Sequence, residues 1–308
     1  MNKVATEYQD FLEKANAFAE EIKLSGIAPT PEQARAGLDA IGQMSLPKVE
    51  VRKVSDLSVE LPDRKIPVRI YDPQPDQNKP VLVFIHGGGH MAGNIDLYDG
   101  ITRRLANTTD HIVVSIDYRL APEFPYPRGL DDCQAVVDHL DILLKDFQAD
   151  LNNISLVGDS AGGALATTIA YHAQINRFSS LILIYPSLDY TFSTQSYKTL
   201  ATGYLLETEK IVWYFDQYFN PDDDRKKASP LFFSDLSHMP KTLILAAALD
   251  PLVDEGKFFH KKLIAAGVDS EYHEGSNLIH CFLNLELVNP ILIDQTYKTI
   301  SSFFTRSS

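Results

Sequence analysis

The sequence has only two cysteines, Cys133 and Cys281, and neither has a second cysteine three positions away. The absence of a CxxC pair excludes a zinc ribbon and a dithiol redox site. A disulfide between the two remains open, but a core built from 308 residues does not need one. We therefore expect reduced cysteines and a cytoplasmic protein.

Basic residues are scarce. The chain has 28 lysines and arginines against 41 aspartates and glutamates, for a formal net charge of −13. A negative surface repels nucleic acids and anionic membranes, so no nucleic acid is expected as a partner. Hydrophobic runs are too short for a membrane span, and the first 23 residues lack the apolar block of a signal peptide. A homodimer is left open.

Internal repeats and low-complexity linkers are also missing. The first segment, residues 3–45, has helical spacing, and a glycine at 26 with prolines at 29 and 31 divides it into two helices. Its apolar side chains recur at steps of three and four at Phe11, Phe18, Ile22, Leu38 and Ile41. We expect a helical pair that docks on the core.

From about residue 49 the hydrophobic period becomes that of strands. Residues 49–61 and 65–73 alternate, and five continuous apolar runs follow at 80–88, 111–118, 153–160, 181–186 and 241–251. Amphipathic helical stretches separate them at 97–107, 129–147, 161–174 and 253–267. This order predicts the α/β class, with a mostly parallel central sheet and helices on both faces.

One stretch, residues 187–240, interrupts the alternation with an amphipathic helix at 206–219 and no strand. An insertion of this size is a candidate lid. Its aromatic side chains either wall off long acyl chains or pack the lid on the core: Trp213, Tyr214, Phe215, Tyr218 and Phe219. The expected division is N-terminal cap helices 1–45, a catalytic domain of 46–186 and 241–308, and a cap insertion 187–240.

Gly158-Asp159-Ser160-Ala161-Gly162 fits the pattern G-x-S-x-G between a predicted strand and a predicted helix. A sharp turn there leaves no room for side chains around the serine, and the helix N-terminus directs free N–H groups at the reacting atoms. We interpret Ser160 as a nucleophile. The alternative is a plain glycine-rich turn.

A glycine run, His86-Gly87-Gly88-Gly89, ends the strand at 81–85. Its amides, with that of Ala161, are candidates to stabilise an oxyanion. A phosphate-binding loop is the alternative, but neither a following Lys-Ser/Thr nor G-x-G-x-x-G spacing is present.

A serine nucleophile needs a base and an orienting acid, which in this type of sheet follow it along the chain. Asp250 ends the last apolar run, whereas Asp254 and Glu255 fall into the next helix. His280 comes after the final strand, in a loop where the base belongs. The other histidines beyond Ser160 are predicted to precede the acid or to lie within a helix or a strand: His238, His260 and His273.

The chain resembles the hormone-sensitive lipase-like family of α/β-hydrolases, and in particular its bacterial acetyl-esterase members. The matching segments are HGGG at 86–89, DYRLAPE at 117–123, GDSAGG at 158–163, DPLVDEG at 250–256 and His280-Cys281-Phe282. The resemblance implies the α/β-hydrolase fold, with a cap made by residues 1–45 and 187–240. It also implies a structural role for residues 118–123. Two departures, His90-Met91 and Val253, are expected to alter the pocket wall.

In the family pattern Ser160 is the nucleophile, Asp250 the orienting acid and His280 the base. The oxyanion amides fall on Gly88, Gly89 and Ala161. The implied function is a serine carboxylesterase for short-chain acyl esters that works through an acyl-enzyme, with no metal and no cofactor. Alternatives are an amidase or lactonase with the same residues, a ligand receptor, or a regulator that binds a protein through the cap.

Overall fold

One eight-stranded sheet runs through the protein, whose computed structural model describes residues 4–306. Residues 1–3 and 307–308, the ends of two predicted segments, lie outside this range. The strands are β1 (Lys53–Glu60), β2 (Lys65–Asp72), β3 (Lys79–Ile85), β4 (Ile112–Ile116), β5 (Ala149–Asp159), β6 (Ser180–Ile184), β7 (Lys241–Leu249) and β8 (Ser270–Ile279).

The strand order is β1-β2-β4-β3-β5-β6-β7-β8. Strand β2 pairs antiparallel with both β1 and β4, and all the other neighbours are parallel. The prediction of a mostly parallel sheet is therefore confirmed. Every residue of β4 and β6 is buried, which explains their continuous apolar sequences.

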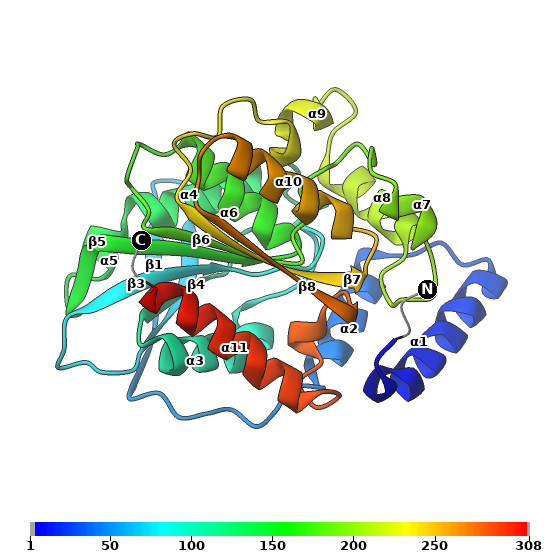
Figure 1. The fold of residues 1–308 in the computed structure, drawn as a ribbon, viewed down its shortest axis with the longest axis horizontal. Helices are drawn as coiled ribbons and strands as arrows, with labels where there is room; N and C mark the ends of the chain where they lie inside the picture. The colour runs from blue at the N-terminus through cyan, green and yellow to red at the C-terminus, as the bar shows by residue number, and fades with distance from the viewer. Residues whose placement is uncertain (1–3, 307–308) are drawn as a thin grey trace.

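Helices cover both faces of the sheet, as predicted (Figure 1). One face carries α4 (Arg128–Asp138), α6 (Ala161–His172) and α10 (Val253–Ala265), and the short α5 (Leu140–Leu143) follows α4. The other face carries α3 (Ile95–Thr109) and α11 (Pro290–Thr305), which pack on each other. Two apolar cores result, one on each side of the sheet.

The remaining helices come from the two predicted cap segments. The N-terminal segment forms α1 (Thr6–Ser25) and α2 (Pro31–Gly42). The insertion forms α7 (Ser196–Thr199), α8 (Thr208–Tyr218), α9 (Arg225–Ala228) and the 3₁₀ turn η1 (Pro230–Phe232), and η2 (Phe282–Asn284) follows β8. In Figure 1, α2, α7 and α8 lie at the end of the sheet where β7 finishes. Both segments thus meet at the carboxyl ends of the parallel strands, where ligands of such sheets bind.

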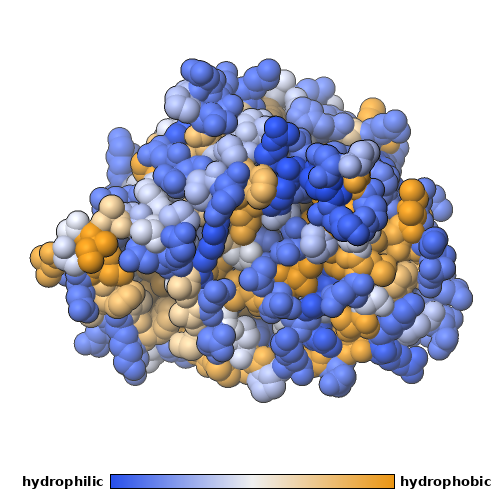
Figure 2. Space-filling model, turned by 180° about the vertical axis from the view of Figure 1, so that it is seen from behind, coloured by the Kyte–Doolittle hydropathy of each residue, from blue (hydrophilic) through white to orange (hydrophobic). Residues whose placement is uncertain are grey.

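Helix α1 packs less completely than its spacing predicts. Tyr8 and Leu12 are buried, but Phe18 is 64% exposed and Ile22 is 42% exposed. The expected helical pair is present, but the second half of α1 extends past the carboxyl ends of the strands, so these two side chains are not covered (Figure 1). Figure 2 shows apolar side chains at that edge of the molecule.

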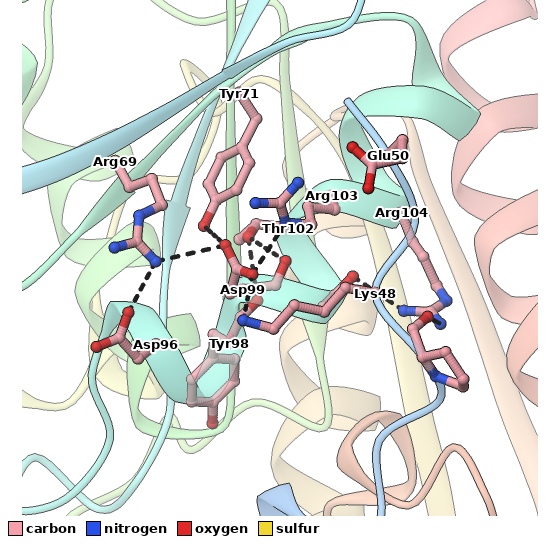
Figure 3. A network of polar contacts seen from close by, with 12 residues as sticks. Lys48, Glu50, Arg69, Tyr71, Asp96, Tyr98, Asp99, Thr102, Arg103 and Arg104 are labelled. Atoms are coloured by element: carbon pink, nitrogen blue, oxygen red, sulfur yellow. Dashed lines mark hydrogen bonds and ion pairs between the residues drawn. The ribbon is translucent and has the colours of Figure 1, made fainter. Parts of the chain in front are cut away.

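A polar network joins α3 to the sheet (Figure 3). Asp99 is buried, and it accepts hydrogen bonds from the Tyr71 hydroxyl at 2.8 Å and from Arg103 at 2.9 Å. Lys48 approaches the same carboxylate to 2.7 Å and Arg69 to 3.4 Å. Because Lys48 belongs to the segment that joins α2 to β1, one carboxylate connects the N-terminal helices, β2 and α3.

No helix in residues 4–306 has the length and apolarity needed to cross a bilayer.

Candidate active site

Ser160 lies at the sharp turn between β5 and α6. Its backbone angles are φ 51° and ψ −121°, in a region that residues other than glycine rarely adopt. A Cβ on Gly158 would come within 2.2 Å of the Gly162 carbonyl oxygen, and one on Gly162 within 2.0 Å of the Ile85 carbonyl oxygen. The two glycines of the motif are therefore required by close backbone packing, which holds the strained serine in place.

The structure brings Ser160 together with His280 and Asp250. His280 Nε2 lies 3.0 Å from Ser160 Oγ, and His280 Nδ1 lies 2.6 Å from Asp250 Oδ2. Asp250 directly follows β7 and His280 directly follows β8, so neighbouring strand ends supply the two side chains. All three are buried, with exposed fractions of 8% for Ser160, 3% for His280 and 1% for Asp250.

The Asp250 carboxylate is fixed from two sides. Its Oδ1 accepts a hydrogen bond from the Leu252 amide at 2.9 Å, while Oδ2 faces the imidazole. Burial is the largest single influence on the pKa of His280 and lowers it, but the charge and hydrogen bond of Asp250, together with the neighbouring Cys281, raise that pKa well above 6.5. The pair is thus arranged to stabilise a positive charge on the ring.

The other histidines considered from the sequence lie elsewhere. His238 contacts the Tyr171 carbonyl oxygen at 2.7 Å, His260 contacts Ser270 at 2.9 Å, and His273 contacts Glu271 at 3.2 Å. None of the three lines the pocket that contains Ser160, as far as the structure describes the chain.

Asp254 and Glu255 contact the cap insertion instead of His280. Asp254 Oδ2 accepts a hydrogen bond from the Ser196 amide at 2.9 Å. Glu255 Oε2 accepts hydrogen bonds from the Leu188 amide and, at 2.8 Å, from the Asp189 amide. From the sequence both carboxylates are assigned only to a helix. In the structure they hold the start of residues 187–240 against α10, a contact that no sequence motif indicates.

The glycine run after β3 lies beside Ser160. Gly88 has φ 115° and Gly89 has φ 63°, and a Cβ on Gly88 would come within 2.1 Å of the Ala92 carbonyl oxygen. Within residues 4–306, the amides of Gly88, Gly89 and Ala161 have no hydrogen-bond acceptor. All three residues line the pocket, so three free donors are available next to the serine hydroxyl.

Asp159 holds this glycine run in position. Its Oδ1 accepts a hydrogen bond from the Gly87 amide at 2.7 Å, and its Oδ2 accepts one from the Tyr98 hydroxyl at 3.1 Å. Burial raises the pKa of Asp159 to about 6. Tyr118, from the DYRLAPE segment, donates to the His86 carbonyl oxygen at 2.8 Å and stacks on the His86 ring. The contact agrees with the structural role expected for residues 118–123.

The expectation that His90-Met91 and Val253 alter the pocket wall is not met in the described residues, because none of the three lines the pocket. His90 is buried, stacks on Tyr218 with ring centres 3.8 Å apart, and lies 3.0 Å from the Tyr190 hydroxyl. Burial lowers the pKa of His90 to about 3, so the ring is neutral at physiological pH. It therefore packs the glycine run against the cap.

A pocket of about 730 Å³, including space open to solvent, lies above Ser160. Both cap segments form its wall, with Leu38 and Ile41 from α2 and a longer stretch around α8 that contributes Leu205, Leu206, Lys210, Ile211, Tyr214 and Phe215. The aromatic stripe of α8 packs on the core and also reaches the pocket wall. Tyr214 and Phe215 belong to the core beneath α8 and also line the pocket. No cluster of metal-ligating side chains occurs in the part of the chain that the structure describes.

Comparison with known proteins identifies relatives over most of the chain. The profile of a family described as having the alpha/beta hydrolase fold matches residues 82–284. The carboxylic ester hydrolase LipN of Mycobacterium tuberculosis is 36% identical over 267 residues, which cover 82% of this chain and 70% of LipN. A protein of Pseudomonas putida named ethyl acetate hydrolase is 32% identical over 247 residues, 75% of this chain and 76% of its own.

Solved structures agree with these relatives. An ester hydrolase from the metagenome of Lake Arreo, in complex with a bipyridine phosphonate derivative, superposes with a TM-score of 0.87 at 29% identity, covering 97% of this chain and 98% of its own. An esterase of Pyrobaculum calidifontis gives a TM-score of 0.84 at 26% identity and 97% coverage of both chains. The chain belongs to the carboxylesterases of the α/β-hydrolase fold that are related to hormone-sensitive lipase.

Proposed function

We propose that this carboxylic ester hydrolase cleaves short-chain acyl esters through an acyl-enzyme intermediate, with Ser160, His280 and Asp250 as its catalytic residues. The observation that carries the proposal is the unbroken hydrogen-bonded chain from Ser160 Oγ through His280 to Asp250, buried at the base of a pocket. Nucleophile, base and orienting acid each have the geometry that ester hydrolysis requires.

In the first half of the reaction, Ser160 Oγ attacks the ester carbonyl carbon while its proton moves to His280 Nε2. The imidazole becomes positively charged, and Asp250 stabilises it across the 2.6 Å contact to Nδ1. The carbonyl oxygen becomes an oxyanion that the amides of Gly88, Gly89 and Ala161 stabilise. His280 then gives its proton to the leaving alcohol, and the acyl group remains on Ser160.

Water completes the cycle. His280, again neutral, takes a proton from a water molecule as its oxygen attacks the acyl carbon. The same three amides stabilise the second oxyanion. The bond to Ser160 Oγ then breaks, the serine oxygen recovers the proton from His280, and the carboxylic acid leaves. No step uses a metal or an organic cofactor.

The preference for short acyl chains is supported by the shape of the pocket. Helix α8 places Tyr214 and Phe215 in the pocket wall, and both rings also pack in the apolar core beneath the cap. Because rings fixed by packing cannot move aside cheaply, they limit the length of an acyl chain. The Pseudomonas putida relative named ethyl acetate hydrolase supports the same size class.

The domain division stays a prediction. We propose that residues 1–45 and 187–240 act together as a cap over the catalytic domain of residues 46–186 and 241–308. Both cap segments line the pocket, and Asp254 and Glu255 tie the insertion to the catalytic domain. We also propose a cytoplasmic location, supported by the free thiols of Cys133 and Cys281.

The test is a series of 4-nitrophenyl acetate, butyrate and decanoate, together with 4-nitroacetanilide to detect amidase activity. We expect acetate and butyrate to be cleaved fastest and the anilide not to be cleaved. Ser160→Ala should reduce kcat about 10⁶-fold, as loss of the nucleophile does in serine hydrolases. Hydrolysis by Ser160→Ala within tenfold of the wild-type rate would contradict the proposed chemistry, and a faster rate on decanoate would contradict the chain-length preference.

A further inference from the structure

Lys210 is the one lysine or arginine among the described residues that line the pocket around Ser160. It lies in the first turn of α8, and its Nζ is 5.7 Å from the centre of the Tyr214 ring, one turn further along the helix. Because Tyr214 is itself part of the pocket wall, the ammonium group lies over that wall. The side chain is exposed, so it is open to a ligand entering from solvent.

The acidic residues nearest to Lys210 in sequence are occupied elsewhere. Lys23 of α1 approaches Glu207 to 3.0 Å and Glu209 to 3.8 Å. Across residues 4–306, Lys210 itself takes part in no ion pair. The contact between α1 and the start of α8 therefore leaves one positive charge at the pocket without a protein counterion.

The rest of the pocket does not oppose an anion. Its wall is largely apolar: Leu38, Ile41, Leu205, Leu206, Ile211 and Leu252. Asp159 is the carboxylate among the described lining residues, and its two oxygens are directed to the Gly87 amide and the Tyr98 hydroxyl. A negative group near Lys210 would therefore meet an attractive charge at the open side of an apolar pocket, with the modest strength of an exposed ion pair.

We infer that the pocket selects esters that carry a free carboxylate a few bonds from the scissile carbonyl, such as half-esters of dicarboxylic acids, with the Lys210 ammonium as the counterion. The inference rests on the ester hydrolysis proposed above and names a substrate class for it. A protein with a net charge of −13 repels anions at long range, so a local cation is needed to retain one. Lys210 acts in binding and takes no part in proton transfer.

The test compares monoethyl glutarate with ethyl valerate, which have five-carbon acyl groups and differ in one terminal carboxylate. Ethanol release gives kcat and KM for the wild type and for Lys210→Met, Lys210→Arg and Lys198→Met. The last variant is the matched control, because Lys198 is an exposed lysine of α7 in the same cap segment that does not line the pocket. Both Met variants change the net charge equally.

We expect the wild type to prefer the glutarate half-ester, and Lys210→Met to lower the ratio of the two kcat/KM values about 5-fold, mainly through KM. Lys210→Arg and Lys198→Met should retain the wild-type ratio. Added NaCl should lower the ratio in the wild type and leave it unchanged in Lys210→Met. Circular dichroism and thermal unfolding establish that Lys210→Met is folded, and its rate on ethyl valerate enters only as the denominator of the ratio.

An unchanged ratio in Lys210→Met, or an equal fall in Lys198→Met, would overturn the inference while leaving the ester hydrolysis itself in place. Ser160→Ala separates the two levels, because it should abolish ethanol release from both esters. If Ser160→Ala cleaved them normally, the proposed catalytic residues would be wrong whatever Lys210 contributed.

Discussion

The contact between Asp250 and His280 offers the sharpest test of the site. Replacing Asp250 by Asn keeps the size of the side chain and the acceptor for the Leu252 amide, but removes the negative charge 2.6 Å from His280 Nδ1. The amide can also donate toward Nδ1, which favours the ring tautomer that carries its proton on Nε2. That tautomer cannot accept the proton of Ser160.

The expected loss has two parts. Two unit charges about 4 Å apart attract by about 4 kcal/mol at an effective dielectric of about 20, and this attraction is gained only when the ring becomes charged during the reaction. Its removal corresponds to roughly 10³-fold in rate, since each 1.36 kcal/mol changes the rate about tenfold. The unfavourable tautomer adds to this, and we expect kcat of Asp250→Asn to fall about 10⁴-fold in total.

The assay measures hydrolysis of 4-nitrophenyl acetate from pH 5 to 9, with circular dichroism and thermal unfolding to establish that the variant is folded. Asp254→Asn is the matched control, because Asp254 lies four residues away and binds the Ser196 amide instead of His280. It should retain activity within about 3-fold of the wild type. With the aspartate gone, burial dominates the pKa of His280, so the residual activity of Asp250→Asn should extend to lower pH.

Activity of Asp250→Asn within tenfold of the wild type would refute the assignment of Asp250. So would an equal loss in Asp254→Asn, which would transfer the role to its neighbour. Asp250→Asn could also lose most of its activity while the rise of that activity with pH keeps the wild-type midpoint. That result would show that the charge on Asp250 does not control the ionisation of His280.

Three further predictions concern the ionisation of His280, the sharp turn at Ser160 and the polar network around Asp99. Because the pKa of His280 is raised and only the neutral ring accepts a proton, wild-type kcat/KM should increase with pH with a midpoint above 6.5; a midpoint at or below 6.5 would contradict this. Gly162→Ala places a Cβ within 2.0 Å of the Ile85 carbonyl oxygen, so expression as soluble, folded protein should be lost, whereas Gly37→Ala on the exposed side of α2, where a Cβ meets nothing within 4 Å, should still fold. Asp99→Asn leaves three cations without their shared carboxylate and should lower the free energy of unfolding in urea by about 1–3 kcal/mol, against less than about 0.5 for the exposed Asp294→Asn.

The sequence by itself determined the fold class and named candidate catalytic residues that the structure brings together. Buried parallel strands must be apolar on both faces, so β4 and β6 are visible as uninterrupted runs. The sharp turn at Ser160 tolerates only glycine at 158 and 162, so the close packing of the backbone is visible in the sequence motif. Chain order then placed Asp250 and His280 after two strand ends, and parallel neighbours bring such ends together.

Only the tertiary structure decided how the cap meets the site. The helical period of α1 indicated a buried face, but it carries no information on where the sheet ends, so the exposure of Phe18 and Ile22 was not predictable. Asp254 and Glu255 appeared as ordinary first-turn carboxylates, since their partners are backbone amides more than fifty residues away, which leave no mark in composition. Lys210 has no motif at all. The place of Lys210 beside the pocket depends on how α8 lies over the sheet. Its lack of a counterion depends on Lys23, which pairs with the nearby glutamates. Contacts of this kind between distant segments exist only in the folded chain.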